Sequence, residues 1–140
     1  MPIATKSSKH DISKESATAK ISKKLSKILK KGDVLFFYGE IGVGKTTFIR
    51  YLINSLQKKN QLRLTEVPSP TFNLLNEYEV KELLIQHYDL FRLKNINETK
   101  NIGLLESYSN VLTLVEWPEK IKKKPKNRID LIFEYKSKLD

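Results

Sequence analysis

The sequence predicts an α/β fold of three layers, in which a mixed central sheet is flanked by helices. Short apolar runs alternate along the chain with stretches in which apolar residues recur every three to four positions, the patterns of buried strands and amphipathic helices. The chain has 140 residues, 39% of them hydrophobic, which suits one domain with a buried core. We therefore expect a single domain over residues 1–140, with residues 1–12 as a flexible N-terminus.

The first half of the chain predicts a helix, a strand, a glycine loop and a second helix. The first helix is expected between Ser13 and Gly32, with five residues on its apolar face: Ala17, Ile21, Leu25, Ile28 and Leu29. Residues 34–38 are apolar or aromatic throughout, as in a strand buried on both faces, and residues 39–44 form the glycine loop. The second helix has an apolar stripe that fades at residues 58–60: Phe48, Ile49, Leu52, Ile53 and Leu56.

The second half predicts a hairpin, a short helix and two further strands. Pro68 and Pro70 favour an extended loop before the hairpin, because residues that precede proline avoid the helical conformation. The hairpin would pair two strands across a turn at Lys81-Glu82. The expected elements are strands over 72–80 and 83–88, a helix over 97–108 capped by Asn97, a strand over 111–115, a basic turn over 120–127 and a strand over 129–135.

The composition excludes several classes of protein. The chain has no cysteine, which rules out disulfides, a thiol nucleophile and cysteine-based metal sites. Its two histidines, His10 and His87, are too few for a histidine-rich metal site. No apolar run approaches the roughly 18–20 residues that span a bilayer, and the N-terminal residues lack the apolar core of a signal peptide. We expect a soluble cytoplasmic protein without membrane contact.

The net charge of +10 is concentrated at the two ends of the chain. Residues 1–31 carry +7 and residues 120–140 carry +5, whereas residues 32–119 carry −2. Only four of the 26 basic residues are arginines, the side chain that specific nucleic-acid readers favour for bidentate contacts. We interpret the lysines as solvated surface, with weak attraction to phosphate backbones as the alternative.

The segment Gly39-Glu-Ile-Gly-Val-Gly-Lys45-Thr46 fits the phosphate-binding motif G-x-x-x-x-G-K-[ST] in full. A predicted buried strand precedes it and an amphipathic helix follows it, which is the context the motif needs. The glycines let backbone N–H groups point at phosphate oxygens, and the N-terminus of the helix adds its positive end. Lys45 would neutralise the β and γ phosphates, and the Thr46 hydroxyl would hold Mg²⁺. The motif predicts a P-loop NTPase fold that binds a nucleoside triphosphate.

Two acidic residues are candidates for the carboxylate that a P-loop NTPase places near Mg²⁺ or the attacking water. Glu116 follows the buried run 111–115, the arrangement of a Walker B strand, and Asp89 follows residues 83–88. For each, the alternative is a surface carboxylate at a strand end, which we favour for Asp89 and disfavour for Glu116. His87 is interpreted as structural. Trp117 is either an apolar anchor or a stacking residue near the nucleotide or a partner.

Other classes of P-loop protein lack their signatures here. The Asn/Thr-Lys-x-Asp guanine motif is missing, so nothing in the sequence indicates specificity for GTP. A small-molecule kinase usually brings a lid with several arginines, and no such segment exists in a chain with four arginines. This weakens the kinase interpretation without excluding it.

Taken together, four segments closely resemble the TsaE (YjeE) family, the small ATPases of bacterial tRNA threonylcarbamoyladenosine synthesis. They occur in the family's order and spacing: Gly39–Thr47, Ser69-Pro70-Thr71-Phe72, His87-x-Asp89-Leu90-Phe91-Arg92 and Glu116-Trp117-Pro118-Glu119. The helix segment from Thr18 to Leu25 is also similar to the family's Thr-x-x-Leu-Gly-x-x-Leu pattern, with Ser22 in place of the usual glycine. The resemblance spans about residues 13–135.

The resemblance implies an ATP and Mg²⁺ site built from these segments. Thr46 and Glu116 would ligate Mg²⁺, Asp89 would orient or activate the attacking water, and Thr71 would lie in a switch-like loop near the γ-phosphate. The other catalytic residue would be Lys45. The resemblance implies nucleotide contacts from Thr18, Ile41, Gly42, Val43, Gly44, Lys45, Thr46, Thr47 and Trp117.

The resemblance also implies partners. Members of this family act with TsaD and TsaB, which transfer a threonylcarbamoyl group to tRNA, and hydrolysis of ATP resets that complex. The chain would reach tRNA only through the complex. Our leading hypothesis is therefore an ATPase that is weak alone and activated by its partners. The alternatives are a small-molecule kinase on the same P-loop and a non-hydrolytic module whose ATP binding gates docking.

Overall fold

One mixed five-stranded sheet organises the chain, whose computed structural model describes residues 8–61, 67, 74–94 and 103–135. The strands are β1 (Val34–Tyr38), β2 (Leu75–Val80), β3 (Leu83–Asp89), β4 (Leu112–Glu116) and β5 (Ile129–Ile132). They lie in the order β2-β3-β4-β1-β5, and β2 is antiparallel to β3 while the other neighbours are parallel. The predicted mixed sheet is confirmed.

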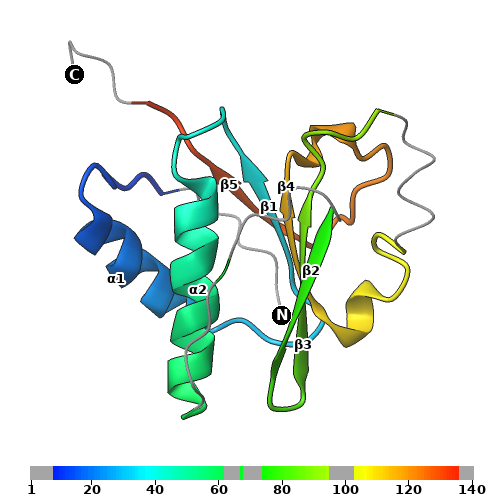
Figure 1. Ribbon diagram of the computed structural model, residues 1–140, viewed down its shortest axis with the longest axis horizontal. Coiled ribbons are helices and arrows are strands. Elements are labelled where there is room, and N and C mark those ends of the chain that lie inside the picture. The colour runs from blue at the N-terminus through cyan, green and yellow to red at the C-terminus, as the bar shows by residue number, and fades with distance from the viewer. Residues whose placement is uncertain (1–7, 62–66, 68–73, 95–102, 136–140) are drawn as a thin grey trace.

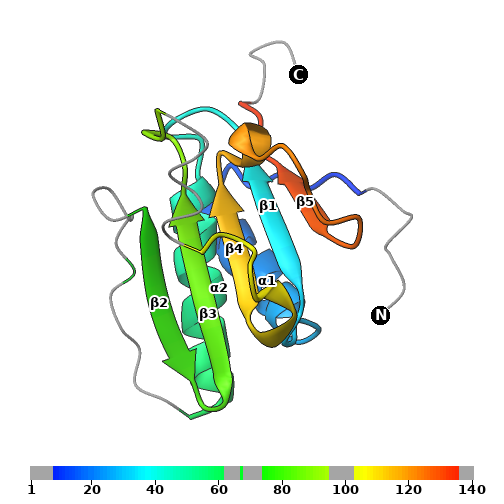
Figure 2. The ribbon, with the colours of Figure 1, turned by 90° about the vertical axis from the view of Figure 1, so that its right-hand side faces the viewer.

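Two helices, α1 (Glu15–Ser26) and α2 (Lys45–Lys59), lie on one face of the sheet (Figures 1 and 2). The apolar stripe of α2 packs against Leu35 and Phe37 of β1 and Leu112 and Leu114 of β4. The opposite face carries Phe36, Tyr88 and Val115 beneath turns and loops, which include the 3₁₀ helices η1 (Tyr108–Asn110) and η2 (Pro118–Lys120). No helix in the described parts of the chain is both long and apolar enough to cross a membrane.

The first helix is shorter than predicted and turns a different side toward the core. It ends at Ser26, so Ile28 lies beyond it and is 54% exposed, although Ile21, Leu25 and Leu29 do contact the core. Its most buried side chains are Thr18, Ser22 and Ser26, spaced four residues apart. Small side chains permit close packing against α2, and the two serines satisfy their buried hydroxyls by donating to the backbone oxygens of Ala19 and Lys23 at 3.0 and 2.7 Å.

Three other expected elements differ in their bounds, and left-handed backbone conformations explain two of the differences. The helix predicted over 97–108 is not present at residues 103–107, which form turns because Gly103 and Leu105 have φ of 69° and 63°; residues 97–102 lie outside the described residues. The strand predicted over 72–80 corresponds to β2, which begins at Leu75 after Leu74 with φ 59°; residues 72 and 73 lie outside the described residues. The strand predicted over 129–135 ends at Ile132.

Candidate functional site

The glycine loop leads from the end of β1 into α2 and leaves the first turn of that helix open. Gly44 is the N-cap of α2 with φ 115°, a left-handed conformation that glycine adopts readily, and no side chain caps the helix there. The N–H groups of the first turn therefore have no side-chain acceptor from the cap, and together with the helix dipole they form an anion site.

Lys45 is the first residue of α2, and its side chain is enclosed by the loop and by Trp117. It is 4% exposed, and its Nζ donates a hydrogen bond to the backbone oxygen of Gly39 and lies 3.9 Å from the centre of the Trp117 ring. Burial lowers the pKa of Lys45, while the negative charges of Glu116 and Asp89 partly oppose this shift. The buried ammonium is therefore a cation that a phosphate group can pair with.

A chain of side-chain hydrogen bonds links α2, β4 and β3 at the carboxyl end of the sheet. The Thr46 hydroxyl donates to Oε1 of Glu116 at 3.0 Å, and Oε2 of the same carboxylate lies 2.8 Å from Nε2 of His87. Glu116 and His87 are both buried. The carboxylate at the end of β4 is thus held between β3 and the first turn of α2.

Strand register places Asp89 beside Glu116. The two residues are Cα partners in the parallel pairing of β3 and β4, and the N–H of Leu90 donates to the backbone oxygen of Glu116 at 3.1 Å. Oδ1 of Asp89 accepts the N–H of Phe91 at 3.1 Å, which fixes the turn that follows β3. Both candidate carboxylates therefore lie at the same edge of the sheet, where α/β folds bind their ligands.

Two aromatic rings pack together in the segments that follow β3 and β4, and Lys120 makes hydrogen bonds between these segments. Trp117 has φ 61°, and its ring lies 4.8 Å from the ring of Phe91, centre to centre. Nζ of Lys120, in η2, donates to the backbone oxygens of Phe91 and Leu93 at 2.6 and 2.8 Å. Lys120 thereby ties η2 to the loop that follows Asp89.

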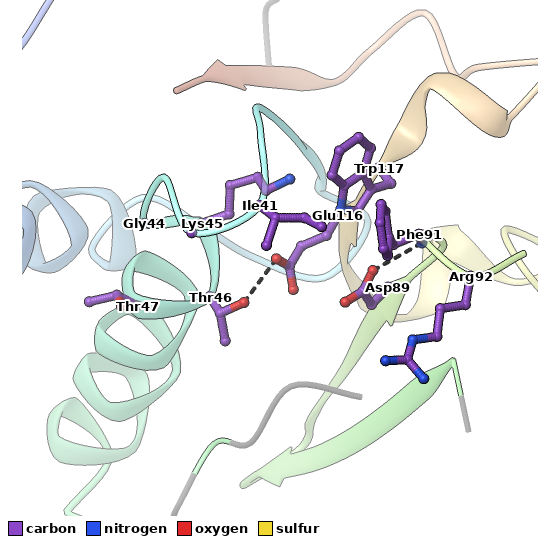
Figure 3. Close-up of a pocket in the computed structure, with 11 residues that line it drawn as sticks. Ile41, Gly44, Lys45, Thr46, Thr47, Asp89, Phe91, Arg92, Glu116 and Trp117 are labelled. Carbon is purple, nitrogen blue, oxygen red and sulfur yellow. Dashed lines mark hydrogen bonds between the residues drawn. The ribbon is translucent and has the colours of Figure 1, made fainter. Parts of the chain in front are cut away.

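These groups surround one open pocket with a volume of about 310 Å³ (Figure 3). Figure 3 shows Lys45 and Trp117 pointing toward each other and Thr46 reaching Glu116, with Asp89 and Arg92 farther along the same edge. The lining residues are Ile41, Gly42, Gly44, Lys45, Thr46, Thr47, Asp89, Phe91, Arg92, Glu116 and Trp117.

Two predicted site residues are placed differently, and a third is not described. Val43 packs against the core beneath the loop, and Thr18 is buried in α1; neither side chain is among those that line the pocket. Thr71 lies outside the described residues.

Sequence reasoning did not assign three residues that the structure brings to the site. His87, interpreted as structural, contacts Glu116, and its position two residues before Asp89 was the available signal. Lys120 was included in a solvated basic turn, although it follows Glu116 by only four residues. Phe91 was noted only as part of a motif, yet it lines the pocket beside Trp117.

The residues present fit a nucleotide with Mg²⁺. Mg²⁺ keeps several waters and is usually bound through one or two protein oxygens together with phosphate oxygens, and Thr46 and Glu116 offer such oxygens within 3.0 Å of each other. The described residues contain no group of three or more His, Asp or Glu side chains that could enclose a metal without such help. The buried ammonium of Lys45 and the open first turn of α2 would supply the matching phosphate site.

Comparison with known proteins agrees with this geometry. The family model described as "Threonylcarbamoyl adenosine biosynthesis protein TsaE" matches residues 12–139. The chain is 40% identical over 113 residues to the Rickettsia conorii "tRNA threonylcarbamoyladenosine biosynthesis protein TsaE", covering 81% of this chain and 62% of that protein. The Bacillus subtilis protein of the same name is 33% identical over 118 residues, which cover 83% of this chain and 70% of that protein.

A solved structure resembles the chain along most of its length. The crystal structure of Bacillus subtilis YdiB aligns with a TM-score of 0.64 and 26% sequence identity, covering 85% of this chain and 70% of that one, which supports the predicted P-loop NTPase fold. The chain spans 62% and 63% of the lengths of its Rickettsia conorii and Rickettsia felis relatives. A family match over residues 12–139, together with the Bacillus relative, shows that the chain belongs to the TsaE family.

Proposed function

We propose that this chain is a Mg²⁺-dependent ATPase that assists a complex of TsaD and TsaB in forming threonylcarbamoyladenosine in tRNA, and that ATP hydrolysis resets the complex. The observation that supports it most is the buried Lys45 ammonium above an open helix N-terminus, with the Thr46 and Glu116 oxygens 3.0 Å apart beside it. The relatives' printed names support the pathway.

In this proposal each pocket residue has a separate role in ATP hydrolysis. Lys45 would pair with the β and γ phosphates, and the N–H groups of the loop and first turn would hold the remaining oxygens. Thr46 and Glu116 would hold Mg²⁺, which neutralises charge on the phosphates when it is bound. Asp89, one strand away from Glu116, would orient the attacking water, with Thr71 near the γ-phosphate.

Weak ATP turnover by the isolated chain would follow from the small number of arginines at the pocket. Arg92 is the only arginine among the described residues that line the pocket, and arginine is the side chain that stabilises charge in phosphoryl-transfer transition states. In this proposal a partner completes the site, Arg92 orients the loop around Asp89, and tRNA is reached only through the complex.

The test is ATP hydrolysis by the purified chain with Mg²⁺, alone and with TsaD and TsaB from the same source. We expect stimulation by the two partners, and we expect Lys45→Ala to abolish it. Lys59→Ala, which removes an exposed lysine from the other end of the same helix, should leave it unchanged.

Three results would count against the proposal. Equal turnover with and without the partners would reject partner activation. Turnover that requires a small-molecule phosphate acceptor would favour the kinase alternative. Retention of tRNA modification by Glu116→Gln and Asp89→Asn variants that bind ATP but do not hydrolyse it would favour a gating module.

A further inference from the structure

His87 and Glu116 form a fully buried contact that the catalytic roles above do not use. His87 is 0% exposed on β3, and its Cα partner on β4 is Leu114, two residues before Glu116. Its Nε2 lies 2.8 Å from Oε2 of Glu116, whereas the Thr46 hydroxyl contacts the other carboxylate oxygen, Oε1. Each carboxylate oxygen therefore has its own partner on a different element.

The other ring nitrogen of His87 indicates which tautomer is present. Nδ1 is buried and has no hydrogen-bond partner among the described residues. A proton on Nδ1 would bury an unsatisfied N–H and turn the lone pair of Nε2 toward a carboxylate oxygen, and both arrangements are costly. The tautomer with its proton on Nε2 avoids both and donates a hydrogen bond to Glu116.

We propose that His87 is a positioning residue for the Mg²⁺ site: its Nε2–H fixes Oε2 of Glu116 so that Oε1 stays directed at Thr46 before the metal arrives. The inference rests on the proposed nucleotide and Mg²⁺ site and adds the group that prepares it. Glu116 lies at the end of β4, where the chain turns into Trp117 with φ 61°, so the side chain needs an anchor outside its own strand. Outer partners of this kind typically change metal affinity by about 10- to 100-fold.

A matched pair of substitutions separates positioning from packing. The amide nitrogen of His87→Gln can reach the place of Nε2, whereas that of His87→Asn is too short, and both bury a neutral amide at the same position. We expect Mg²⁺ affinity, measured with saturating non-hydrolysable ATP analogue, to stay within about threefold for His87→Gln and to fall about 10- to 100-fold for His87→Asn. Nucleotide affinity in EDTA should not change in either variant.

The control is Ile85→Ala, two residues earlier on the same face of β3, which loses buried apolar volume without losing a donor. It should lower stability and leave the Mg²⁺ affinity of the folded protein as in the wild type. Equal Mg²⁺ affinity in the Gln and Asn variants would overturn the inference, and so would a loss of metal-free nucleotide binding in His87→Asn. A wild-type chain with no Mg²⁺-dependent nucleotide binding would instead overturn the proposed function itself.

A measurement on the wild-type chain needs no folded variant at position 87. Nitrogen-15 NMR of the imidazoles, without nucleotide or metal, should show His87 protonated at Nε2 and bare at Nδ1. The chain has only two histidines, and His10 is exposed, so His10→Gln assigns the remaining signals. A proton on Nδ1 with Nε2 bare would overturn the inference.

Discussion

Alanine at Gly39 should destabilise the protein far more than alanine at Gly44, although both glycines belong to the same loop. Both have φ in the left-handed region, 145° and 115°, so both substitutions carry a backbone cost of about 1–3 kcal/mol. At Gly39 a Cβ would also lie 2.8 Å from the backbone oxygen of Phe133 and 2.9 Å from Cγ1 of Val43, whereas at Gly44 it would meet nothing within 4 Å. Overpacking of this kind adds about 1–3 kcal/mol.

We therefore expect the free energy of unfolding to fall by about 1–3 kcal/mol in Gly44→Ala and by about 2–6 kcal/mol in Gly39→Ala, with the overpacking cost of about 1–3 kcal/mol as the difference between them. The assay is urea denaturation without nucleotide, followed by circular dichroism, so that any loss of ligand binding does not enter the comparison. The slopes should match that of the wild type if the native fold is kept. A difference below about 1 kcal/mol between the two variants would refute the steric argument.

Three further predictions concern side chains around the pocket. The Lys45 ammonium lies 3.9 Å from the ring of Trp117, the only tryptophan in the sequence, so nucleotide binding should change the tryptophan fluorescence. The Lys45→Met substitution should also change the fluorescence when no nucleotide is present. Identical spectra for the wild type and Lys45→Met would contradict this contact. Burial raises the pKa of Tyr88 to about 12, so between pH 9 and 11 the unfolded chain loses the phenol proton and the native state keeps it. In urea denaturation the wild type should therefore lose about 1 kcal/mol of unfolding free energy over this pH range relative to Tyr88→Phe. Parallel pH profiles of the two proteins would disprove this prediction. Lys120→Met should weaken nucleotide binding severalfold, because it removes the hydrogen bonds to two backbone oxygens of the loop after Asp89. The control in the same titration is Lys122→Met, which replaces an exposed lysine. Equal nucleotide affinities of the two variants would show that the Lys120 hydrogen bonds are not needed for binding.

Elements that are specified locally were predictable from the sequence. Residues 34–38 form β1 with the predicted bounds, because a short run of five apolar residues that ends at a glycine loop suits a strand buried on both faces of a sheet. The hairpin also matches, with its turn at Lys81-Glu82, even though Lys81 has to adopt φ 56°. Asn-Gly or Asp-Gly would favour that left-handed conformation, and the sequence has neither at this turn.

Features that depend on a neighbouring element were not predictable. The hydrophobic pattern of the first helix identified the helix but not its most buried face, because the close approach of α2 selects Thr18, Ser22 and Ser26. The pattern over 97–108 is helical in sequence, yet Gly103 and Leu105 take left-handed backbone conformations, and Leu105 packs against the second core cluster.

The same distinction holds for the candidate site. Consecutive residues such as Gly44, Lys45 and Thr46, where the loop passes into α2, were assigned from the motif, and the structure brings them to one pocket. Glu116 and Asp89 were recognised as strand ends, but only the register of β3 and β4 makes them neighbours. His87 and Lys120 make contacts with residues 29 and 27–29 positions away in sequence; their closeness to Asp89 and Glu116 in the sequence was a signal for the site, but it did not identify these contacts.

The resting partners of Lys45 have a consequence for how long a nucleotide stays bound. A phosphate that draws the ammonium away from the Trp117 ring and the Gly39 oxygen replaces a cation–π contact and a charged hydrogen bond, together worth about 2–3 kcal/mol. That exchange weakens affinity by about 30- to 150-fold relative to a lysine with no competing contacts. In the proposed ATPase the same two contacts would receive the lysine back when the nucleotide leaves, and they would therefore favour release of the product.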